Sequence, residues 1–258
     1  MTRFAATVER FLDAGVVLRK EFVQAVKGRR VFWILAAVAA MMHLSMILAA
    51  SPLKHSSAYR DVSVVLQTLF AHYPIPTAII FFINLAQPVF IKERSNRSLE
   101  SLLATPLHPW SIWLGKSLSC WAIGWTGSGL ACCAAWFTFG LTLGTLIPPG
   151  AAALAFYFTV GPMLALGILL LLGAANLILR NAAAANAFCI YFAIGYMFLA
   201  SFWPGSLAPS WRTAAWFLLA AAATNALAFS LASRFTAEEM ILASSRCEAD
   251  SQRGFSCL

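Results

Sequence analysis

Long apolar runs dominate the chain, and ionisable residues interrupt them mainly at their ends. Hydrophobic residues make up 60% of the 258 positions and charged residues 11%, against roughly 45–50% and about 25% in soluble domains. A globule of this size cannot hide so much apolar surface from water. The composition excludes an ordinary soluble enzyme, a disordered chain and a secreted disulfide scaffold. It predicts an all-α membrane protein.

Six of these runs have the length of about 20 residues that a helix needs to cross a bilayer. The predicted spans are Val31–Ala50, Val62–Ile91, Trp110–Leu146, Ala151–Leu179, Ala183–Trp203 and Trp211–Ala232. Pro74, Pro76 and Pro88 predict that the second run enters through a kinked or interfacial turn. The third run is too long for one straight span, which leaves room for tilt or an irregular end. A Pro-Pro-Gly turn at 148–150 separates the third and fourth runs. The boundary at Arg180 is the weakest, so five or seven spans stay open.

The basic residues lie almost entirely on one side of this topology. With a cytoplasmic N-terminus, only Lys54, Arg60 and Arg212 of the 18 Lys and Arg residues face outward, which leaves 15 inside. This asymmetry predicts that both termini are cytoplasmic, and it explains the net charge of +8 without a nucleic-acid partner. The predicted organisation is an interfacial segment at 1–30, a six-span domain at 31–233 and a cytoplasmic tail at 234–258.

The segment before the first span has the pattern of an amphipathic helix. Its apolar residues recur mostly every three or four positions, and polar residues, Glu21 among them, fill the intervals. The apolar set is Phe4, Val8, Phe11, Leu12, Leu18, Phe22 and Val26. This pattern predicts a helix in the inner membrane interface. A cytoplasmic helix with a stripe that faces a protein partner is the alternative.

The loop between the second and third spans predicts a short helix with its own start and stop. Ser95 or Asn96 can cap it, and Pro106 and Pro109 end it. An apolar face of Leu99, Leu102 and Leu103 lies beside Arg97, Glu100 and Ser101. An exposed leucine stripe on a cytoplasmic helix indicates docking to a soluble partner. An inert loop is the alternative.

The segment Ile91–Lys116 resembles the permease subunits of type 2 (type V fold) ATP-binding-cassette (ABC) exporters. The resemblance rests on Glu-Arg, then Leu-Glu-x-Leu-Leu-x-Thr-Pro, then Gly-Lys at the head of the next span. Family members usually carry Gly-Thr before Leu-Glu, where this chain has Arg97-Ser98. The resemblance implies a coupling helix at about 93–109. The residues it implies for coupling to the ATPase are Glu93, Arg94, Arg97, Leu99, Glu100, Leu102 and Leu103.

The same resemblance implies a function. The chain would be a non-catalytic permease subunit that forms half of a translocation pathway in a bacterial-type cytoplasmic (inner) membrane. Its partners would be membrane lipids, a second permease copy in a homodimer or close heterodimer, and two copies of a separate ATPase. That ATPase would hold ATP and Mg²⁺, and this chain would bind no cofactor. The alternatives are a membrane scaffold without transport and an ABC complex that extracts a lipid or peptide.

Other motifs give weaker signals. Gly115-Lys116-Ser117 resembles the end of a phosphate-binding loop, but Trp110 stands where that loop needs a glycine. We therefore expect Lys116 to anchor the third span at the headgroups. The spans contain no convincing Asp or Glu, which argues against ion-coupled transport.

Polar and small residues inside the spans are expected to serve mainly in helix packing. The amide and imidazole groups expected to bond across helices are His43, Asn84, Gln87, Asn176, Asn186 and Asn225. Asn84, Gln87, Tyr191 and Tyr196 are also candidates to line a pathway. Gly124, Gly127 and Gly129 should permit close helix approach. The six cysteines follow no metal-ligand spacing, and the four inside apolar runs should pack as small hydrophobes.

Overall fold

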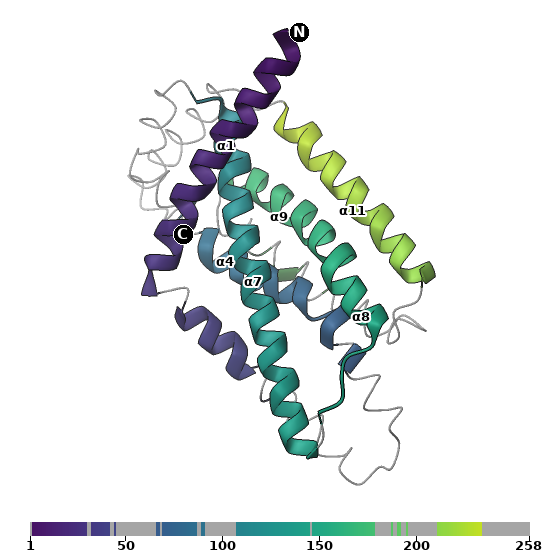
Figure 1. Cartoon of the computed structure of the whole chain (residues 1–258). Coiled ribbons are helices and arrows are strands. Elements are labelled where there is room, and N and C mark those ends of the chain that lie inside the picture. The colour runs from purple at the N-terminus through teal and green to yellow at the C-terminus, as the bar shows by residue number, and fades with distance from the viewer. Residues whose placement is uncertain are drawn as a thin grey trace.

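The computed structural model is helical wherever it has regular structure within the residues that it describes (Figure 1). The described residues are 2–29, 32–41, 44, 66–67, 69–86, 89–90, 107–144, 146–178, 187, 190–191, 195 and 211–233. The predicted all-α class is therefore confirmed for this part of the chain.

Three described helices are long and apolar enough to cross a membrane: Pro109–Leu143, Ala151–Asn176 and Arg212–Ala232. They coincide with the predicted third, fourth and sixth spans. The shorter apolar helices Phe32–Met41 and Pro74–Leu85 lie within the predicted first and second spans. Most of the predicted fifth span lies outside the described residues. The structure thus agrees with an integral membrane protein, and the count of six spans stays a prediction.

The second apolar run is broken where the sequence predicts a kink. A turn at His72 and Tyr73 precedes α4 (Pro74–Ala86). Proline is tolerated in the first turn of a helix because the backbone N–H that it lacks would have no intrahelical partner there. Pro74 and Pro76 therefore set the start of α4.

The third apolar run forms a single helix, α7 (Pro109–Leu143), of 35 residues. His108 caps its start, since the imidazole Nδ1 accepts a hydrogen bond from the Trp110 backbone N–H at 3.2 Å. Gly144 ends it in the left-handed conformation, with φ of 74°, which costs glycine little because it has no Cβ. The helix thus stops before Leu146, which confirms the predicted irregular end.

The fourth apolar run begins after the Pro-Pro-Gly turn and contains a π-helical insertion. Gly150 is extended and caps α8 (Ala151–Ala155), which continues into η2 (Phe156–Val160) and α9 (Gly161–Ile178). The Gly161 N–H bonds to the carbonyl of Phe156, five residues back. The next residue, Pro162, has no N–H to donate, which favours this wider turn.

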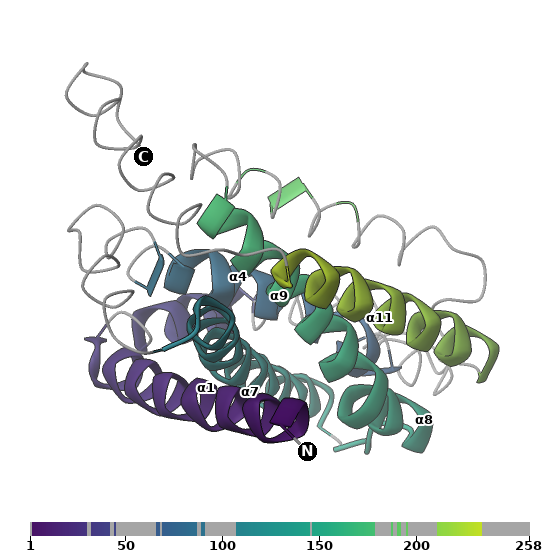
Figure 2. The same ribbon diagram turned by 90° about the horizontal axis from the view of Figure 1, so that it is seen from above.

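The core lies where α4, α7 and α9 meet. The largest side chains with no more than about 1% exposure include Phe81 and Phe82 of α4, Trp113 of α7 and Leu169 of α9. Helix α1 (Thr2–Lys27) lies along α7, and α11 (Trp211–Ala232) lies along α9 (Figures 1 and 2). The two outer helices therefore flank the pair that α7 and α9 make.

Indole groups of α7 fix its position against its neighbours. Trp113 Nε1 donates to the Leu170 carbonyl at 3.2 Å, and Trp121 Nε1 donates to the Pro162 carbonyl at 3.1 Å. Such bonds between helices have a direction that apolar packing in lipid lacks. They hold α7 and α9 in one register.

Candidate functional site

Residues 93–106 of the predicted coupling helix lie outside the described residues, and at its predicted C-terminal end Leu107 and His108 are not helical and Pro109 begins α7. Residues 93–106 include all its proposed contact residues, which are Glu93, Arg94, Arg97, Leu99, Glu100, Leu102 and Leu103. Their role stays a prediction. The structure describes the two flanks of the segment, which are Val89 and Phe90 before it and Leu107 onward after it. These flanks form the base of the candidate site.

Helix α1 contacts the start of α7 through small residues. A Cβ on Gly115 would lie 2.6 Å from the Ala14 carbonyl oxygen and 2.7 Å from the Val17 Cβ. Only glycine allows the two backbones to approach this closely. The ring of Phe11 meets the ring of Trp110 edge to face, with centroids 5.0 Å apart. The contact between α1 and α7 is thus apolar near the N-terminus of α7.

Most large apolar residues of α1 remain exposed, including Phe11, of whose ring only part meets Trp110. Val8, Phe11, Leu12, Phe22 and Val26 are all exposed, Leu12 by 68%. Their side chains thus remain available to another apolar environment, as the predicted interfacial helix requires. The alternative, a protein partner on this stripe, uses the same exposed side chains.

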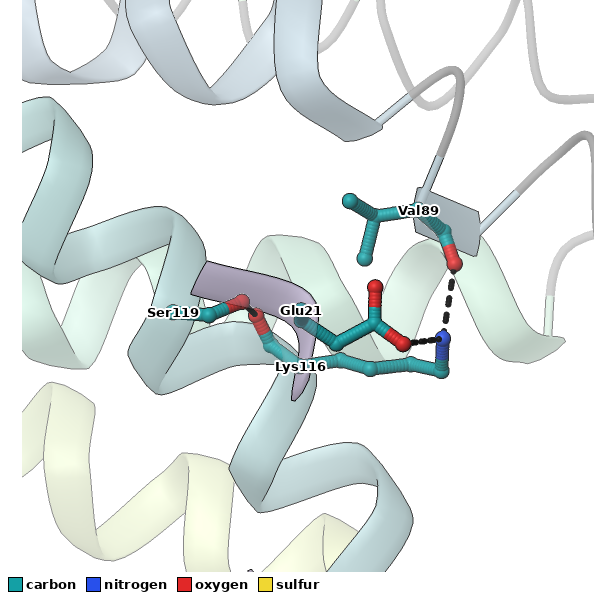
Figure 3. A network of polar contacts seen from close by, with 4 residues as sticks. All are labelled: Glu21, Val89, Lys116 and Ser119. Carbon is teal, nitrogen blue, oxygen red and sulfur yellow. Dashed lines mark hydrogen bonds and ion pairs between the residues drawn. The ribbon is translucent and has the colours of Figure 1, made fainter. Parts of the chain in front are cut away.

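Lys116 lies at the centre of a buried polar network (Figure 3). Its Nζ lies 3.0 Å from Oε1 of Glu21 and donates a second hydrogen bond, also of 3.0 Å, to the Val89 carbonyl oxygen. The side chains of Lys116 and Glu21 are 1% and 4% exposed. The ammonium also lies 6.0 Å from the ring centroid of Phe90. One side chain of α7 therefore reaches both α1 and the residue that precedes the coupling segment.

The prediction that Lys116 anchors the third span at the headgroups is wrong. Helix α1 covers this part of α7, and the lysine binds Glu21 instead of extending to solvent. Sequence reasoning also grouped Glu21 with the polar face of α1, although it is 3% exposed. A signal was present, because Glu21 follows Ala14 and Val17 at helical spacing on a face of small residues.

His108 supplies a titratable group just before α7. Burial lowers the pKa of its imidazole below the ordinary value, and the positive charge of Arg10 on α1 lowers this pKa further. Both effects favour the neutral ring, and a neutral ring is what the Nδ1 cap of α7 requires.

The polar residues of the predicted spans use their amides in different ways. Asn225 Nδ2 donates to the Met163 carbonyl on α9 at 2.9 Å, so it bonds between helices as predicted. The amides of Asn84 and Asn176 donate within their own helices, to Ile80 and Leu172. His43, Gln87 and Asn186 lie outside the described residues.

The candidate pathway residues are only partly described. Asn84 is exposed, and Tyr191 is 73% exposed. Gln87 and Tyr196 lie outside the described residues. That these four line a pathway stays a prediction.

The glycines of α7 have the packing role that we predict for them. A Cβ on Gly124 would lie 3.1 Å from the Ala78 carbonyl oxygen, and one on Gly127 would lie 2.7 Å from the Phe81 ring. A Cβ on Gly129 would meet the Tyr157 hydroxyl. Among the described residues no group of three or more His, Cys, Asp and Glu side chains could hold a metal ion.

These features define an integral membrane protein built from apolar helices. The chain belongs to the ABC-2 family of transporter proteins, because the family model described as "ABC-2 family transporter protein" matches residues 32–242. The resemblance found in the segment Ile91–Lys116 is thereby confirmed at the level of the family. Membership implies, in general, an ABC ATPase partner. No curated protein and no solved structure matches the chain.

Proposed function

We propose that the chain is the permease subunit of an ATP-driven ABC exporter. It forms half of a translocation pathway, pairs with a second permease copy, and receives its energy from two separate ATPase subunits that hold ATP and Mg²⁺. The observation that carries the proposal is the family match over residues 32–242. That match encloses the leucine-rich segment at about 93–109, which has the features of a docking helix.

The charge distribution supports an orientation in the bacterial-type inner membrane. Fifteen of the 18 basic residues fall in segments that the six-span topology places in the cytoplasm. Both termini and the coupling segment then lie on the side where an ATPase meets ATP.

The proposed mechanism is mechanical. Binding of ATP brings the two ATPases together, and each carries the coupling helix seated on it. The spans of the two permease copies then rearrange and open a path between them. This chain provides the docking surface and the helices that move, whereas ATP is hydrolysed on the partner ATPase. Purified alone, it should therefore hydrolyse no ATP.

A charge on the leucine stripe tests the proposal. Leu102→Asp places a carboxylate in a contact that must exclude water, and an unpaired buried charge costs several kcal/mol. We expect affinity for the ATPase to fall by about a hundredfold or more, or export to be lost although binding persists. The measurement is co-purification with the ATPase, together with ATP turnover of the complex.

Ser101→Asp is the matched control, because it adds the same charge beside the stripe. It should be milder in both measurements, and both variants should insert normally, since the changes lie outside the spans. Full binding and full turnover by Leu102→Asp would show that the segment is an inert loop. If the chain binds an ATPase but the ATP turnover of that ATPase does not respond to the permease, the result would favour the membrane scaffold without transport.

A further inference from the structure

Three separate parts of the chain meet at the ammonium group of Lys116. Glu21 belongs to α1, Lys116 belongs to α7, and Val89 follows α4 and precedes the segment that carries the coupling motif. Figure 3 shows the Glu21 carboxylate and the Val89 carbonyl converging on the lysine nitrogen. The two bonds are of equal length, 3.0 Å.

Burial of the ion pair between Glu21 and Lys116 costs free energy, because both charged groups lose their hydration. Both side chains are nearly inaccessible, and an ion pair at such a site often adds less stability than well-packed apolar residues of the same volume. The attachment of α1 does not depend on it alone, because α1 also packs through Ala14, Val17 and Phe11. The geometry therefore favours a role for the ion pair in positioning α1 and α7 rather than in stabilising the fold.

The position of the network is at the base of the coupling segment. Val89 stands just before residues 91–106, and Lys116 stands in the first turns of α7 just after them. The bond from Lys116 to Val89 thus closes the two ends of the segment together. The bond from Lys116 to Glu21 ties this closed base to α1. A displacement of the segment would then move α1 and α7 together. Without these two bonds, the chain next to the segment would bend locally and the helices would not move.

We propose that Glu21 and Lys116 are positioning residues that join α1, the chain at Val89 and α7 into one mechanical unit, through which ATPase movement reaches the spans. The inference rests on the proposed function, and it concerns transmission after docking. It assigns roles to two residues outside the leucine stripe. Their loss should separate binding of the ATPase from its effect.

Three variants separate the two bonds of the network. Glu21→Gln weakens the ion pair. The exchange variant E21K/K116E restores a pair between α1 and α7, but a carboxylate at position 116 cannot donate to the Val89 carbonyl. Lys116→Arg keeps donors for both partners. Glu9→Gln is the matched control, because Glu9 is an exposed carboxylate on the same helix.

The assay uses the complex of the full chain with its ATPase subunit in lipid nanodiscs. We expect Glu21→Gln and E21K/K116E each to lower kcat for ATP by about tenfold, within the range that coupling mutations reach. The KM for ATP and co-purification should not change, since the nucleotide and the docking stripe lie elsewhere. Lys116→Arg should retain most of the turnover, and Glu9→Gln should match the unmodified chain.

Three results of the turnover and co-purification measurements would overturn the proposal. Unmodified turnover by E21K/K116E would show that the tie to Val89 is dispensable. An equal loss of ATP turnover in Lys116→Arg and Glu21→Gln would indicate that the site requires the shape of the native side chains and not their bonds. Loss of co-purification in Glu21→Gln would place the pair in docking instead of transmission.

A second measurement distinguishes failure of this inference from failure of the proposed function. Hydrogen exchange around residues 89–90 of the chain alone should rise in E21K/K116E but not in Lys116→Arg. A chain that binds no ATPase at all would defeat the proposed function, and with it any role in coupling. Unchanged exchange in every variant would overturn the tie itself.

Discussion

The contact between α1 and α7 should weaken when a single methyl group is added at Gly115. In Gly115→Ala the new Cβ would lie 2.6 Å from the Ala14 carbonyl oxygen, against 3.4 Å for the closest ordinary contact, so α1 must retreat by roughly 0.8 Å. The obstacle is backbone, and it cannot rotate away as a side-chain tip could. The same retreat would stretch the bond between Glu21 and Lys116, now 3.0 Å long.

The magnitude follows from two opposing effects. Overpacking of a close contact costs about 1–3 kcal/mol, while replacing a helical glycine by alanine returns up to about 1 kcal/mol through propensity. The net loss is about 1 kcal/mol, or roughly a fivefold fall in an equilibrium constant. It should appear where α1 meets α7.

Hydrogen exchange of the α1 amides in detergent micelles measures this loss directly. Gly15→Ala is the control, because Gly15 lies on the exposed side of α1 and its new Cβ would meet nothing within 4 Å. We expect α1 protection to fall in Gly115→Ala and to hold or rise in Gly15→Ala. Equal or greater protection in Gly115→Ala would refute the argument that close backbone approach decides this contact.

Two further predictions concern orientation and pH. A cysteine at Ser57 should react with an impermeant label from outside and one at Ser98 only from inside, and reversed or two-sided labelling would defeat the six-span topology. The lowered pKa of His108 means that the unfolded chain binds a proton more readily, so the cap stabilises fully above the ordinary pKa of 6.5 and is lost as pH falls through the folded value. The protection factors of the amides at the start of α7, which correct for the intrinsic pH dependence of exchange, should therefore fall as the pH drops below 6.5, whereas in His108→Asn, which caps without titrating there, they should not.

The helices could largely be predicted from the sequence, since hydrophobic runs and their breakers act locally. The predicted sixth span and α11 share the bounds Trp211 and Ala232, and the kink before α4 falls at Pro74. The irregular end of the third run lies at Gly144, where backbone freedom is needed.

The base of the candidate site could not be predicted, because it depends on which face of α1 meets α7. Amphipathic reasoning directs the large apolar residues toward a contact, yet α1 presents Ala14, Val17 and Glu21 to α7 and leaves Leu12 exposed. The partner of Lys116 is 95 residues away in sequence, and no local pattern specifies such a pair. The coupling residues themselves stay predictions.

The π-helical turn at Phe156–Val160 has a consequence for how this helix can vary between relatives. A π turn holds one residue more than an α turn, and one residue corresponds to about 100° of rotation around a helix. Loss of one residue here would restore a regular α-helix while α9 keeps its indole-fixed register against α7. The side chains of α8 and α9 would keep their present directions, because the π turn already accommodates the extra residue within itself. This segment can therefore absorb a one-residue deletion in evolution, whereas the same deletion in an uninterrupted α-helix would rotate one half against the other by about 100°.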